Sequence, residues 1–132
     1  MLNVATGNFK YDKRNDGWTL LENTPCRISS IIEAVQFLKN ESLVKGEVMA
    51  TRAILLDANY GQEDAEWLLE HQKMISVELR SYYLVFPATK WRGLGGGRSV
   101  PCLFWRGDRW VLGFGWLGGD FRSGGRLVRP RK

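Results

Sequence analysis

The chain has 132 residues, the size of one ordinary domain, and its composition of 44% hydrophobic and 25% charged residues excludes disorder of the whole chain. The net charge of +5 is unevenly spread, because residues 98–132 carry 8 Lys and Arg against 2 Asp and Glu, whereas residues 1–97 carry 11 against 12. This asymmetry indicates either an anionic partner or a solvated basic tail, and the two interpretations weigh about equally.

The first residues, MLNVATGNFKYDK, lack the basic and apolar regions of a secretory signal. No apolar run approaches the ~20 residues that cross a bilayer, so we expect no membrane association. Cys26 and Cys102 are therefore expected to be reduced thiols in a cytoplasmic protein, and their spacing fits no zinc site. We expect neither a metal nor a cofactor.

In chain order, residues 1–16 are predicted to form a loosely held arm, and residues 18–22 (WTLLE) a short strand. Thr24 as a cap and Pro25 at the first helical position predict a helix over residues 25–39. Apolar side chains recur at helical spacing along it. They are Ile28, Ile31, Ile32, Val35 and Leu38.

Residues 47–58 fit both a helix and a strand with period-two alternation, and their composition favours the helix. A further helix is predicted over residues 62–75. Its first turns carry Glu63, Asp64 and Glu66, where negative charge meets the positive end of the helix dipole.

Beyond residue 75 the pattern favours strands. Residues 76–91 are rich in β-branched and aromatic side chains and predict a strand that ends near Pro87. A flexible loop over 92–99, a hairpin over 102–119, a turn over 118–125 and a last short strand over 126–129 follow. Eleven of the fifteen glycines lie between residues 93 and 125, as a turn-rich β region requires.

The order of elements predicts an α+β fold, with two or three helices in the N-terminal half packed on one face of an antiparallel sheet formed mainly by the C-terminal half. We expect a single domain over residues 1–132, with a mobile arm at about 1–16 and a basic tail at about 127–132.

The hairpin sequence CLFWRGDRWVLGFGWLGG defines its own register if Gly107 and Asp108 form a two-residue type II′ turn. Counting outward pairs Arg106 with Arg109, Trp105 with Trp110, Phe104 with Val111, Leu103 with Leu112, Cys102 with Gly113 and Pro101 with Phe114. Alternate pairs share a face. One face is then rich in Trp, and the other, which we call the glycine face, carries Phe104, Val111, Cys102, Gly113 and Gly115. Since Pro101 lacks a donor, the first arm is predicted to be a local edge strand.

Both faces of this hairpin need a cover, and an aromatic-lined pocket for a small molecule or a partner protein is the leading hypothesis. Its candidate wall residues are aromatic and come from the late β region. They are Tyr82, Tyr83, Phe86, Trp91, Trp105, Trp110 and Trp116. The glycine face is expected to let a ring or a backbone approach closely.

The alternative hypothesis is binding of RNA or single-stranded DNA, since Arg attracts phosphates and exposed rings stack on bases. The candidate anion contacts are the arginines of the C-terminal quarter that precede the tail. They are Arg98, Arg106, Arg109, Arg122 and Arg126. Arg106 and Arg109 repel each other unless an anion or a carboxylate, for example from the acidic helix or a second subunit, lies between them. A homodimer is a further hypothesis.

Motifs of known chemistry are weak. The tripeptide at 106–108 (RGD) is explained by the turn, and GLGGG at 93–97 lacks the Lys-Ser/Thr and the helix of a phosphate loop. His71 stands alone on an apolar stripe, and a dyad with Cys26 or Cys102 and Asp57 has no positive support. An enzyme of unknown class is therefore the last alternative, and no catalytic residue is assigned.

Overall fold

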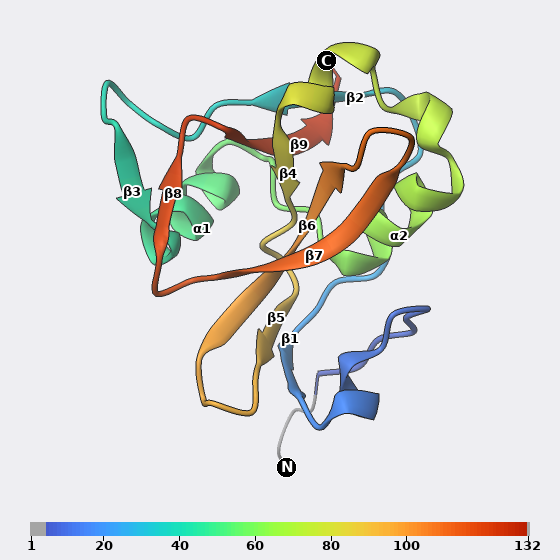
Figure 1. Cartoon of the computed structure of the whole chain (residues 1–132), viewed down its shortest axis with the longest axis vertical. Coiled ribbons are helices and arrows are strands. Elements are labelled where there is room, and N and C mark those ends of the chain that lie inside the picture. The colour runs from blue at the N-terminus through green and yellow to red at the C-terminus, as the bar shows by residue number, and fades with distance from the viewer. Residues whose placement is uncertain (1–4, 132) are drawn as a thin grey trace.

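The computed structural model describes residues 5–131, so that residues 1–4 of the predicted arm and Lys132 of the predicted tail lie outside the described residues. Two α-helices and a large curled, mostly antiparallel sheet form an α+β fold (Figure 1). The helices are α1 (Gly46–Leu55) and α2 (Gln62–Glu70), with 3₁₀ turns η1 (Lys13–Asp16), η2 (Gln72–Met74) and η3 (Val77–Ser81). The strands are β1 (Thr19–Glu22), β2 (Ile32–Val35), β3 (Leu43–Lys45), β4 (Tyr83–Val85), β5 (Lys90–Arg92), β6 (Arg98–Trp105), β7 (Trp110–Trp116), β8 (Asp120–Arg122) and β9 (Gly125–Pro130).

The long strand β6 organises the larger sheet. β7 pairs with it from Ser99 to Trp105 along one edge, so β5 and β4 occupy successive stretches of its other edge. From β5 the sheet continues to β1, and from β4 it continues through a parallel pair with β9 to β2. A separate pair, β3 and β8, closes one side of the curl (Figure 1).

The predicted hairpin register is confirmed at every pair. Trp105 faces Trp110, Pro101 faces Phe114, and the two Trp rings meet edge to face at 6.0 Å between centroids. Gly107 has φ of +95°, which only glycine adopts easily at the first position of this turn. The turn and the alternation of side chains are local properties, and they decide this element without help from the rest of the chain.

The two faces of β6 belong to two different cores. Alternate residues of the sheet, such as Leu84 and Leu103, pack in one cluster with Ala65 and Leu68 of α2. The residues between them, such as Val85 and Cys102, pack in the other cluster with Met49 and Ala53 of α1. The expected placement of the helices on a single face is therefore not confirmed. The Trp-rich face of the hairpin is covered by α2, since Trp110 is buried in its cluster.

The predicted helix over 25–39 is wrong. Residues 32–35 instead form β2, which pairs with β9 over four residues, and the backbone N–H groups of Arg27 and Ile28 donate to the buried Asp64 carboxylate. Pro25 suits an extended entry as well as a first helical turn. The long-range partners β9 and Asp64 override the helical spacing of the isoleucines.

Three further boundaries differ. The predicted turn over 118–125 contains β8, which pairs with β3, and the segment before Tyr83 is the 3₁₀ turn η3 and not a strand. The helix from residue 62 ends at Glu70, while the predicted helix over 47–58 appears as α1. The prediction that β6 is an edge strand at Pro101 is also wrong. On the side of β6 away from β7, β5 pairs with the residues before Pro101 and β4 pairs with those after it, and the Pro101 carbonyl accepts a bond from the Phe86 N–H at 2.9 Å.

Candidate binding site

The seven predicted wall residues divide into three groups. Phe86, Trp91 and Trp110 are buried and fill the core. Tyr82 and Trp105 are each covered by a guanidinium group, that of Arg126 at 4.1 Å and that of Arg80 at 3.8 Å from the ring centroid. The structure brings only Tyr83 and Trp116 together in one open hollow.

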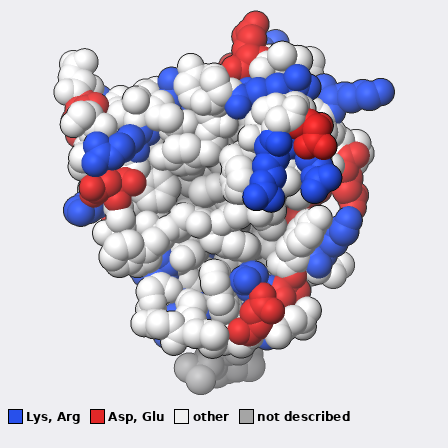
Figure 2. Space-filling model, in the orientation of Figure 1, with Lys and Arg blue, Asp and Glu red and all other residues white. Residues whose placement is uncertain are grey.

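This hollow, which we call the aromatic groove, has a volume of about 550 Å³ and is bordered by residues of the glycine face, by β8 and by Phe114 and Trp116, two residues of β7 that alternation assigns to the Trp-rich face. Five of its nine lining residues are aromatic. The lining residues are Tyr83, Cys102, Phe104, Phe114, Gly115, Trp116, Gly119, Asp120 and Phe121. The face shown in Figure 2 is uncharged over its middle, and charged side chains surround this area, among them groups over β8 and over the hairpin tip.

Glycines let these rings lie against the backbone. A Cβ added to Gly113 would stand 2.6 Å from the Phe104 ring, and one added to Gly115 would stand 3.2 Å from the Phe121 ring. The expected close approach on the glycine face is thus made first by the protein's own rings. Trp116 is 61% exposed and Phe104 38% exposed, so both rings still offer surface to a ligand.

The polar groups of the aromatic groove are uncharged except for one. Burial raises the pKa of the Cys102 thiol to about 12, and burial also raises the pKa of Tyr83, whose hydroxyl accepts a bond from the Arg122 N–H at 3.4 Å. The exception is Asp120. The Lys45 ammonium group, which donates to it at 2.8 Å, lowers the pKa of this carboxyl. The lining of the groove is therefore largely uncharged, and its one carboxylate is already paired.

Three of the five candidate arginines are engaged within the chain. Arg98 pairs with Glu47, Arg122 lies 3.7 Å from Asp120, and Arg126 stacks on Tyr82. Arg106 and Arg109 at the hairpin tip have no ion pair among residues 5–131.

The acidic helix does not supply the missing carboxylate. Glu63 accepts a bond from Asn23, Asp64 from the backbone of Gly61, Arg27 and Ile28, and Glu66 from the backbone of Lys10 and Tyr11. These carboxylates hold the N-terminal third of the chain against α2. The carboxylates of the acidic helix thus mainly connect α2 to the N-terminal segment of the chain.

No arrangement for catalysis emerges in the described part of the chain. His71 stacks flat on Trp67, with ring centroids 3.8 Å apart, and its Nδ1 lies 2.7 Å from the Trp67 carbonyl oxygen. Burial raises the pKa of Cys26 as well as that of Cys102, so neither thiol is activated as a nucleophile. Between residues 5 and 131 no three His, Cys, Asp or Glu side chains gather as a metal site would require, and neither helix has the length and hydropathy to span a bilayer.

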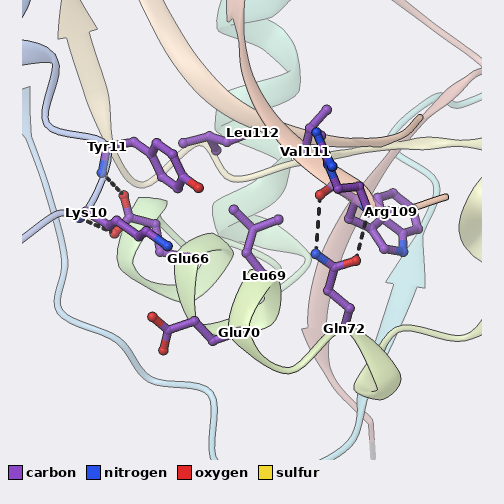
Figure 3. A pocket seen from close by; sticks show the side chains of 10 residues that line it. Lys10, Tyr11, Glu66, Leu69, Glu70, Gln72, Arg109, Val111 and Leu112 are labelled. Atoms are coloured by element: carbon purple, nitrogen blue, oxygen red, sulfur yellow. Dashed lines mark hydrogen bonds between the residues drawn. The ribbon is translucent and has the colours of Figure 1, made fainter. Parts of the chain in front are cut away.

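A second hollow of about 350 Å³ lies between the N-terminal segment, α2 and β7 (Figure 3). Its lining mixes both charges with apolar side chains. The lining residues are Lys10, Tyr11, Glu66, Leu69, Glu70, Gln72, Arg109, Trp110, Val111 and Leu112. Sequence reasoning missed this hollow because nothing local places residues 10–16 beside β7. It also missed Phe121, which the predicted turn over 118–125 had left out of the sheet region.

Comparisons of the chain with protein-family models, with curated proteins and with solved structures gave no match.

Proposed function

We propose that this chain is a non-enzymatic binding domain whose aromatic groove takes an uncharged, largely apolar small molecule. The observation that carries the proposal is the lining: five aromatic residues, a protonated thiol and a single carboxylate that Lys45 already neutralises. A volume of about 550 Å³ falls within the range of small-molecule pockets.

Replacing Trp116 tests this proposal. The neutral fluorescent probe N-phenyl-1-naphthylamine should bind the native protein saturably, and Trp116→Ala should raise its Kd about tenfold, because the exposed ring supplies apolar contact worth roughly 1.4 kcal/mol. Fluorescence titration measures both values. Leu55→Ala is the matched control, since Leu55 is also exposed and apolar but lies on α1 outside the groove. Equal Kd values for the native protein and Trp116→Ala, or no saturable binding, would contradict the proposal.

A second candidate function is binding of single-stranded nucleic acid, and the unpaired Arg106 and Arg109 favour it. Register places both side chains on the same face as Phe104, two residues along β6, so a phosphate at the tip and a base on the ring are compatible. We expect an oligonucleotide to lose about sevenfold in affinity between roughly 50 and 200 mM salt if two phosphate contacts account for the binding.

In the double variant Arg106→Ala/Arg109→Ala this salt dependence should largely disappear. Arg92→Ala on β5 is the matched control, because Arg92 is exposed but lies near the far end of β6, opposite Arg98. Fluorescence anisotropy with a labelled oligonucleotide gives the Kd at each salt concentration. Salt-independent binding, or the same slope in both variants, would reject this candidate.

A further inference from the structure

One edge of β7 pairs with no other strand among residues 5–131. The Arg106 N–H donates to the Arg109 carbonyl, so these two residues form a hydrogen-bonded pair. In an antiparallel ladder such pairs alternate with pairs that exchange no bonds, so the next hydrogen-bonded pairs are Phe104 with Val111 and Cys102 with Gly113. Leu112 and Phe114 occupy the intervening positions of β7, which exchange no bonds with β6. Their backbone N–H and C=O groups therefore point away from β6. No residue of the range 5–131 bonds these four groups, because β7 pairs with β6 alone.

Gln72 shows that this edge accepts a strand-like partner. Its side-chain amide accepts a bond from the Trp110 N–H at 2.9 Å and donates to the Trp110 carbonyl at 3.3 Å, as a peptide unit of a neighbouring strand would (Figure 3). Trp110 is the next outward-facing residue before Leu112 in the same ladder. Along this edge, the Gln72 side chain thus pairs with Trp110, and the backbone groups of Leu112 and Phe114 have no such partner among residues 5–131.

Two hollows follow this open edge. The hollow of Figure 3 borders residues 109–112, and a second one of about 340 Å³ borders Leu112 and Phe114. Both also border Tyr11, so they are neighbours along one channel between β7 and the N-terminal segment. Side chains at positions i and i+2 of an extended peptide are about 6.8 Å apart, the spacing of Leu112 and Phe114 along β7.

We propose that this channel, which we call the edge channel, binds an extended peptide segment of a partner protein as an added β-strand. Backbone groups of Leu112 and Phe114 supply the ladder bonds, and apolar side chains at alternate positions enter the two hollows beside Tyr11, Leu69 and Leu112. Edge strands are often protected from further pairing by a Lys or Pro residue or by a β-bulge, and β7 contains none of these. A single strand fits better than a second copy of this chain, because residues 10–16 and α2 border the channel where a second sheet would have to lie.

The test uses a capped heptapeptide of alternating Val and Thr with the isotope-labelled full chain, followed by amide NMR. Saturable shifts of the Leu112 and Phe114 amides, together with slowed hydrogen exchange, are expected. Two isomeric peptides, N-methylated on alternate residues, provide the control. Only the isomer whose methyl groups face β7 should lose at least tenfold in affinity, because it cannot donate to the edge.

Two results with peptide would overturn the proposal: no amide shifts at millimolar peptide, or equal binding of the two isomers. A third is that the Leu112 and Phe114 amides shift with protein concentration in the absence of peptide, because this would assign the edge to self-association. The edge channel shares one residue, Phe114, with the lining of the aromatic groove, and Trp116 lies outside the channel. Peptide binding should therefore be unchanged in Trp116→Ala and in the presence of N-phenyl-1-naphthylamine, whereas loss in either condition would show that one surface serves both.

Discussion

Asp64→Ala is expected to lower the free energy of unfolding by about 4 kcal/mol, one of the largest effects of a single substitution in this chain. The carboxylate of Asp64 is buried and accepts bonds from three backbone N–H groups, those of Gly61 at 2.9 Å, Arg27 at 2.7 Å and Ile28 at 3.1 Å. The first bond caps α2, and the other two hold the extended segment that leads into β2. With alanine, buried donors lose their acceptor and two segments lose their connection.

Urea denaturation of the native protein, Asp64→Ala and Glu70→Ala measures this effect. Glu70 is the matched control, since it lies on the same helix but is exposed, and its side chain makes no hydrogen bond to another residue of the range 5–131. Its replacement should change the free energy of unfolding by less than about 0.5 kcal/mol. A loss below about 1 kcal/mol in Asp64→Ala would show that water replaces the carboxylate and that Asp64 does not anchor β2.

Gly46→Ala is expected to destabilise the protein by about 3 kcal/mol, although alanine is the better helix former by about 1 kcal/mol in a helix interior. Gly46 is the first residue of α1 and lies against the turn after β7, where its N–H donates to the Gly119 carbonyl at 3.0 Å. A Cβ at this position would stand 2.4 Å from the Leu117 carbonyl oxygen and 2.6 Å from the Leu117 Cα. These are backbone atoms, so relief requires moving α1 away from the sheet.

Thermal unfolding should show a fall in Tm of about 10 °C for Gly46→Ala. Gly95→Ala is the matched control, because a Cβ at Gly95 has no atom within 4 Å and its φ is not positive. An unchanged or higher Tm for Gly46→Ala would mean that helix propensity outweighs the contact with the turn.

Local chemistry made the hairpin predictable. The Gly107–Asp108 turn and the period-two alternation on each side define which residues pair, and every predicted pair between Pro101 and Trp110 occurs. The helices α1 and α2 were predictable for the same reason, since their composition and first-turn charges act within a few residues.

The helix predicted over 25–39 shows where such reasoning stops. Ile28 and Ile32 are both buried, as the helical spacing requires, but Ile31 is exposed and Ile32 lies in a strand. The partners that decide this segment, Asp64 and β9, are 36 or more residues away from the residues they bond. Their bonds contribute more than the small differences in helix propensity between the residues involved.

The candidate sites follow the same division. The hairpin, its Trp-rich face and its glycine face follow from local sequence, because turn chemistry and alternation depend on neighbouring residues. Three features depend on the folding of the whole chain: Trp110 is core, Trp116 and Tyr83 meet Phe121 in one groove, and residues 10–16 border the open edge of β7. Burial and pairing between distant segments depend on how the whole chain encloses its core, which no local pattern specifies.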